Sequence, residues 1–194
     1  VAGTVAGAIL GDLPTRLKLG LMFELLQYDI LPVGAVRYPE YGPATIAAVA
    51  TAHAAAGVLG LGLGALVGLV TAMIGGITIN ELRRVNSRVV HAAAATLEAG
   101  DPRALVRLHV GAVARDALRA ALVTGFGLFL AWLARPLLAG PVSGRDAIVL
   151  ASAAVASALA AGAAGTLRLV GKGPILGWFA AGLGAGLVVA VWLR

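Results

Sequence analysis

Three apolar segments in the C-terminal half of this sequence constrain the fold more than any other feature. The segment 147–167 is 21 residues long and has no charged side chain, and the segment 174–193 is another uncharged stretch of 20 residues. A helix needs about 20 predominantly apolar residues to cross the hydrocarbon of a bilayer. A shorter apolar segment at 118–134 ends at Arg135-Pro136. Because a helix satisfies all its backbone groups internally within lipid, these segments predict an all-α membrane fold with three transmembrane helices.

The composition agrees with a membrane protein. Hydrophobic residues make up 60% of the chain and charged residues 12%, with a mean hydropathy of +0.94. Soluble domains average about 45–50% apolar and about 25% charged residues. We therefore predict one polytopic membrane domain over residues 1–194, without a separate soluble domain. The sequence opens at Val1 within an apolar run, so we expect a further helix before it.

The basic residues indicate the orientation in the membrane. The net charge is +6, but the arginines lie between apolar segments rather than in one dense block, which favours lipid headgroups over nucleic acid as their partner. The distribution of positive charge places residues 80–119 and 168–172 inside and residues 135–146 outside. The chain has no cysteine, which excludes disulfides and thiolate chemistry, and we expect neither a cofactor nor a metal.

Residues 44–79 are predicted to form glycine-rich helices. These 36 residues contain no Asp, Glu, Lys or Arg. Because the segment is too long for one membrane span and short for two, we expect a break within 57–64. A small residue then recurs at every fourth position: Gly60, Gly64, Gly68, Ala72 and Gly76. Such a stripe lets a neighbouring helix approach closely. A dinucleotide-binding loop is the weaker interpretation, since no strand precedes the glycines.

Residues 80–119 are predicted to form an amphipathic helical hairpin on or partly inside the cytoplasmic face. They hold seven Arg, four acidic residues and two His, with Val and Leu at helical spacing. The turn is marked by Gly100 as the residue after the first helix, Asp101 as the N-cap of the second and Pro102 as its first residue.

Residues 11–43 carry the candidate binding residues. Prolines and carboxylates interrupt this segment, so no 20-residue apolar span fits, and broken backbone at membrane depth has to be covered by protein or line a polar cavity. We therefore predict a re-entrant hairpin or discontinuous helix around a polar site, as in transporters. The candidate ligands are Glu24, Gln27, Asp29 and Glu40.

These side-chain types suit a polyhydroxy ligand. Carboxylate and amide groups together accept and donate hydrogen bonds, which sugar hydroxyls require. The same carboxylate and amide groups would bind other polar substrates equally well. Glu24 is the strongest candidate because it stands among leucines, whereas Asp12, Asp29 and Glu40 are also compatible with turns or caps at the membrane edge.

The segment 10–47 resembles the IIC membrane subunits of the mannose/fructose/sorbose family of phosphotransferase (PTS) sugar transporters. The family pattern is an LGD, a following Thr, a leucine-flanked Glu, a Gly and a Pro-acid pair. Matching positions here are Leu10-Gly11-Asp12, Thr15, Gly20, Glu24, Gly34 and Pro39-Glu40. The polar stretch 85–110, which includes His109, is also similar to the family's polar helix pair. Positions that depart from the pattern are Arg16, Asp29, Arg37 and Tyr38.

This resemblance implies a sugar permease in the bacterial inner membrane. A IIC subunit works with a IID membrane partner, in a trimer of such pairs, and carries a hexose that the cytoplasmic IIA and IIB phosphocarriers phosphorylate. It carries no phosphate and no catalytic residue itself. By matching position, the resemblance gives Glu24 and Glu40 the roles of contacting the substrate or shaping its site.

Two other classes remain open. A non-transporting IIC-like scaffold would use the same small-residue helices for packing in a larger membrane complex. An intramembrane enzyme would need an acid–base pair or a metal site, but the three histidines lack the spacing of a known metal motif.

Overall fold

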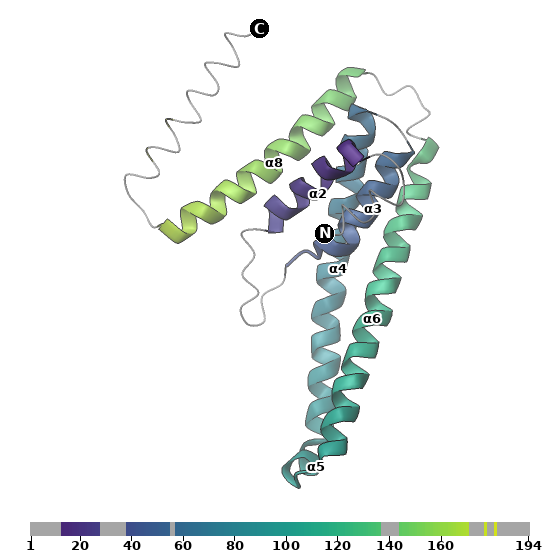
Figure 1. The fold of residues 1–194 in the computed structure, drawn as a ribbon, viewed down its shortest axis with the longest axis vertical. Coiled ribbons are helices and arrows are strands. Elements are labelled where there is room, and N and C mark those ends of the chain that lie inside the picture. The colour runs from purple at the N-terminus through teal and green to yellow at the C-terminus, as the bar shows by residue number, and fades with distance from the viewer. Residues whose placement is uncertain are drawn as a thin grey trace.

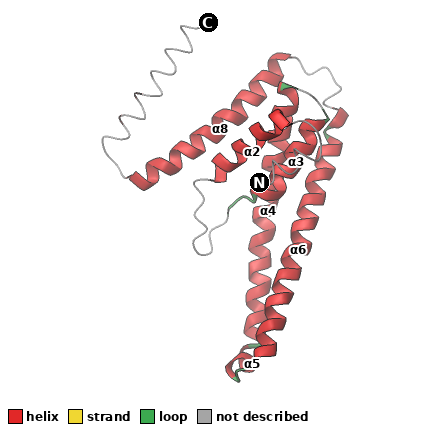
Figure 2. Cartoon of the chain, viewed as in Figure 1, coloured by secondary structure: helices red, strands yellow, loops and turns green. Residues whose placement is uncertain are grey.

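The structure, a computed structural model, describes residues 13–27, 38–54, 57–136 and 144–170 together with 177 and 181. Every regular element in these ranges is an α-helix, and they contain no strand (Figure 2). The predicted all-α fold is therefore confirmed. Asp29, the segment before residue 13 and most of the predicted span 174–193 lie outside the described residues.

Two long helices form the axis of the molecule. Helix α4 (Val58–Ala92) and helix α6 (Pro102–Leu133) run side by side and are joined by the short helix α5 (Ala94–Glu98), as Figure 1 shows. Both long helices have the length and composition to cross a membrane. The predicted spans 118–134 and 147–167 fall almost wholly in α6 and wholly in helix α8 (Gly144–Val170). The chain is thus an all-α membrane protein.

Two short helices pack around the first half of α4. Helix α2 (Leu13–Gln27) contacts α3 and α8, and helix α3 (Tyr41–His53) contacts α4 and α6 (Figure 1). The 15 described residues of α2 rise about 22 Å. Within the polar segment 11–43, the described residues comprise α2, the non-helical residues 38–40 and the first three residues of α3.

The small-residue stripe of α4 is a packing face, as predicted. All five of its members are buried. A Cβ added at Gly64 would lie 2.6 Å from the carbonyl oxygen of Ala48 in α3, and one added at Gly68 would overlap the ring of Phe23 in α2. The absence of a side chain at these positions is what lets α2 and α3 lie against α4.

The break before α4 lies at the start of the expected range. Helix α3 ends at His53 and α4 begins at Val58, with Gly57 at a φ of +86° between them. A positive φ suits glycine because it has no Cβ. Gly60 and Gly64, where the break was also expected, lie inside α4, and Gly64 packs there against Ala48 of α3.

The predicted hairpin is the far end of the two long helices rather than a pair of separate helices. Helix α4 continues through residue 80 without interruption, so the predicted boundary there does not match the end of a helix. The predicted turn is confirmed: Gly100 has a φ of +76°, the Asp101 carboxylate accepts a hydrogen bond from the N–H of Arg103 at 2.9 Å, and Pro102 opens α6. We call residues 80–118 the arm.

The arm extends beyond the apolar part of α4. Residues 58–79 contain no charged side chain and rise about 33 Å, enough to fill the hydrocarbon layer. The remaining residues 80–92 rise about 20 Å further, while a headgroup layer is only about 5–8 Å thick. A chain that crosses the membrane along α4 therefore carries its arginine-rich arm into the aqueous phase.

We expect Gly64→Ala to lower the thermal stability of the protein in detergent, at a cost of about 1–3 kcal/mol, because the new methyl group meets backbone. The control is Gly125→Ala on α6, where an added Cβ has no neighbour within 4 Å. Thermal unfolding of both variants checks this. Equal melting temperatures for Gly64→Ala and the wild type would contradict the packing role of the stripe.

The cysteine-free chain allows the orientation to be tested by single-cysteine labelling. Ser87→Cys on the arm should react with a membrane-impermeant maleimide in inside-out vesicles and not in intact spheroplasts. Gly144→Cys, at the start of α8, should show the opposite pattern. Labelling of Ser87→Cys from the outside would reverse the orientation inferred from the arginines.

Candidate functional site

The segment before α3 is docked on the glycine face of α4. The N–H of Glu40 donates a hydrogen bond to the carbonyl oxygen of Ala72 at 2.9 Å. A Cβ on Gly75 would lie 2.7 Å from the Cβ of Glu40, and one on Gly76 would overlap the carbonyl oxygen of Tyr38. The two glycines thus let residues 38–40 lie directly on the helix.

The Glu40 carboxylate is held by Arg119 of α6. The two Nη atoms of Arg119 lie 2.5 and 2.8 Å from the two carboxylate oxygens, which is a bidentate pair. The same guanidinium donates to Asp116 Oδ1 from Nε at 3.0 Å and from Nη2 at 2.9 Å. The side chains of Arg119 and Glu40 are only 10% and 19% exposed, whereas that of Asp116 is 55% exposed.

This ion pair lies at the edge of the apolar layer. Arg119 Nη1 is 3.4 Å from Thr78 Oγ1, and Thr78 stands two residues before the first polar residue of the arm, Asn80. A charge that is largely removed from water needs a partner with good geometry. The pair meets that need and links the 38–40 segment, α4 and α6 at the base of the arm.

A second contact continues from the same segment along the arm. Arg83 Nη2 donates to the Tyr38 hydroxyl at 2.7 Å, and its guanidinium lies 5.1 Å from the centre of the Tyr38 ring. Arg115 likewise donates from Nε to Asn86 Oδ1 at 2.8 Å, which joins the two sides of the arm. These contacts make the base of the arm a polar network rather than a solvated charged surface.

Glu24 and Gln27 lie elsewhere, on an exposed side of α2. Their depth follows from Phe23, which packs against Gly68. Gly68 is near the middle of residues 58–79, about 15 Å from each end of that stretch. Glu24 is therefore near the midplane of the layer that α4 spans, one turn before Gln27.

The structure separates the predicted site residues into two groups. Glu24 and Gln27 share a side of a mid-depth helix, whereas Glu40 is bound by Arg119 at the layer's edge. Asp29 lies outside the described residues. Arg119 and Asp116 were not predicted as site residues, because Glu40 and Arg119 are 79 positions apart in the sequence and no spacing rule joins them.

Arg16, one of the positions that depart from the family pattern, is fully buried in α2. Its Nη2 lies 3.0 Å from Nδ1 of His53, at the end of α3. The one histidine within the apolar segment 44–79 is thus a partner of a buried guanidinium. Across the described ranges, no three histidines or carboxylates are grouped as a metal ion would require.

The helices and the polar contacts define an all-α membrane protein in which α2, α3 and the Glu40–Arg119 ion pair lie against the long apolar helix α4. A family model described as the PTS system sorbose-specific IIC component matches residues 1–191, and the chain belongs to this family. The chain is 31% identical over 122 residues to the PTS system sorbose-specific EIIC component of Klebsiella pneumoniae, an alignment that covers 63% of this chain. It covers 45% of that relative's length. No solved structure matches the chain.

Removing Arg119 should destabilise the protein more than removing the charge of Glu40. Arg119→Met leaves a poorly exposed carboxylate without its partner, and we expect a loss of about 3–5 kcal/mol. Glu40→Gln leaves Arg119 paired with Asp116, so its loss should be smaller. The free energy of unfolding in detergent, measured for each of the two variants and for the wild type, checks this order.

The matched control is Arg88→Met, an exposed arginine of the arm for which the structure shows no ion pair with a described residue. Its stability should stay within about 0.5 kcal/mol of the wild type. If Arg119→Met is no less stable than this control, the ion pair does not stabilise the base of the arm.

Proposed function

We propose that this chain is the sugar permease (IIC) subunit of a phosphotransferase-type transporter, and that it translocates a hexose which partner subunits phosphorylate. The observation that supports this most directly is the position of Glu24, level with the middle of the apolar part of α4. An ionisable side chain at that depth is costly in hydrocarbon and marks a substrate or ion pathway. Membership of the sorbose-specific IIC family points to the same function.

The proposed substrate contacts are Glu24 and Gln27, with Asp29 following in the chain. A carboxylate accepts hydrogen bonds from sugar hydroxyls, and an amide both accepts and donates them. Because the Glu40 carboxylate is already held by Arg119, we assign Glu40 the task of shaping the site through the 38–40 segment. The name of the Klebsiella relative makes sorbose the first hexose to test.

The proposed assembly follows from the family. It consists of this chain with a IID membrane subunit, in a trimer of such pairs, served by IIA and IIB phosphocarriers. Its place is the bacterial inner membrane, which the chain crosses several times. The arm, on the side that the arginines assign to the cytoplasm, would then face the phosphocarriers.

A non-transporting scaffold is the second candidate. The observation that favours it is the use of the matched carboxylate Glu40 in an internal ion pair, together with the extensive small-residue packing of α4. In a scaffold, Glu24 would serve as a structural hydrogen-bonding group.

The experiment is uptake of radiolabelled sorbose, fructose and mannose by membranes that contain this chain and its co-expressed partner subunits. Glu24→Gln should lower saturable uptake at least about tenfold, because a hydrogen bond to a charged group contributes about 1.5–3 kcal/mol. The control is Glu98→Gln, at the exposed tip of the arm, which should transport as the wild type does.

Protein levels are compared by immunoblot in the same membranes. Wild-type uptake by Glu24→Gln would remove Glu24 from the sugar site while leaving the transporter assignment in place. No uptake of any hexose by a correctly inserted complex would favour the scaffold.

A further inference from the structure

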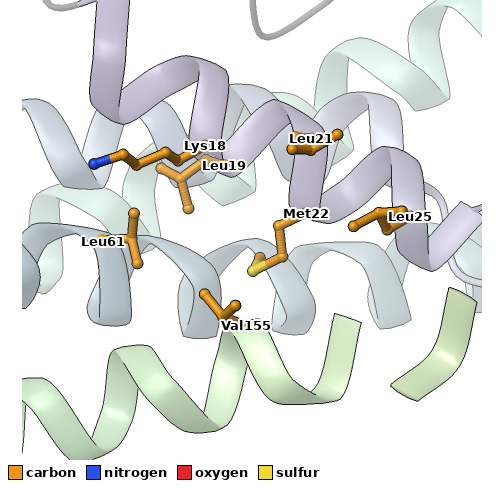
Figure 3. A pocket seen from close by; sticks show the side chains of 7 residues that line it. All are labelled: Lys18, Leu19, Leu21, Met22, Leu25, Leu61 and Val155. Atoms are coloured by element: carbon orange, nitrogen blue, oxygen red, sulfur yellow. The ribbon is translucent and has the colours of Figure 1, made fainter. Parts of the chain in front are cut away.

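A cavity of about 290 Å³ lies between α2, α4 and α8 (Figure 3). Helix α2 supplies most of its wall, α4 contributes Leu61 and α8 contributes Val155. The residues from α2 are Lys18, Leu19, Leu21, Met22 and Leu25. The cavity is separate from the Glu40–Arg119 pair, which lies at the other end of the apolar part of α4.

The walls of this cavity exclude a sugar. Six of the seven lining side chains are hydrocarbon or thioether, so the hydroxyls of a hexose would lose their hydrogen bonds to water without gaining others. A wholly apolar ligand would offer no negative group to the ammonium of the seventh residue, Lys18. The exposed side chain of Lys18 forms no hydrogen bond or ion pair within the described part of the chain.

Lys18 lies at the end of the cavity that is nearest to the membrane surface. Leu19 packs against Gly64 and Phe23 against Gly68, so α2 and α4 run in the same direction here. Lys18 precedes Leu19 and is therefore nearer to Val58, where the apolar part of α4 begins. In Figure 3 the lysine stem extends toward one end of the group of lining residues, while Leu25 lies at the other. A lysine placed this way extends its ammonium toward the headgroups.

We propose that this cavity binds an anionic phospholipid of the surrounding bilayer. One acyl chain lies between α2, α4 and α8, and the headgroup phosphate pairs with the Lys18 ammonium. An apolar cavity with a single cation at its interfacial end matches an amphiphile whose head is negative. The lining of this cavity does not include Glu24 or Gln27, although it lies beside them on α2, and its Lys18 end is at the side of the membrane opposite the arm.

The test is native mass spectrometry of the purified full chain in detergent, with added phosphatidylglycerol or phosphatidylcholine of identical acyl chains. The wild type should bind phosphatidylglycerol preferentially. Lys18→Gln should lower that preference about fivefold, the factor that corresponds to roughly 1 kcal/mol for one basic residue near anionic lipid. Lys18→Arg should retain it. Val155→Phe, which adds bulk inside the cavity, should weaken the binding of both lipids.

The control is Arg103→Gln at the tip of the arm, which removes an exposed cation far from the cavity and should leave the preference unchanged. Lys18→Gln changes an exposed side chain, so its result holds even if Val155→Phe fails to fold. An unchanged preference in Lys18→Gln, or a similar loss in Arg103→Gln, would overturn the site in favour of general charge attraction. Unchanged lipid binding by a folded Val155→Phe would also overturn it.

Discussion

The close approach of chain segments to the glycine face of α4 is the constraint on which the rest of the structure depends. Gly64 and Gly68 admit α3 and α2, and Gly75 and Gly76 admit the extended segment 38–40. In a membrane, helices associate through close packing rather than through burial from water, so a smooth face is what a partner helix requires. These contacts set the positions of both carboxylates along α4, because Phe23, the neighbour of Glu24, packs on Gly68, and Glu40 itself packs on Gly75.

This arrangement gives the two matched glutamates different environments. Glu24 follows a phenylalanine that packs halfway along the apolar part of α4, whereas Glu40 lies where that part ends. One carboxylate is at a depth where hydrocarbon would penalise it, and the other is neutralised by a guanidinium from the same chain. The family pattern matches both glutamates, but the structure places their carboxylates in different surroundings.

The sequence predicted the features that depend on local chemistry. The Gly100-Asp101-Pro102 turn, the buried small-residue stripe and the all-α class all follow from rules about neighbouring residues. It did not predict that α4 continues past residue 80, because a rise in polarity looks the same whether a helix ends or merely leaves the membrane. It also missed Arg119 as the partner of Glu40, since that contact depends on how three separate segments pack. Arg16 and Tyr38, which depart from the family pattern, have partners in His53 and Arg83 that only the fold brings near.

The unbroken course of α4 and α6 through the edge of the membrane has a mechanical consequence. Neither helix is interrupted between the arm and the level of the Glu40–Arg119 pair, so two continuous helices join the arm to that pair. A displacement of the arm would therefore be passed along these helices to the segment 38–40, which contacts both of them, and from there to the start of α3. The arm and the apolar part of the protein are in this way connected by unbroken helices rather than by a loop.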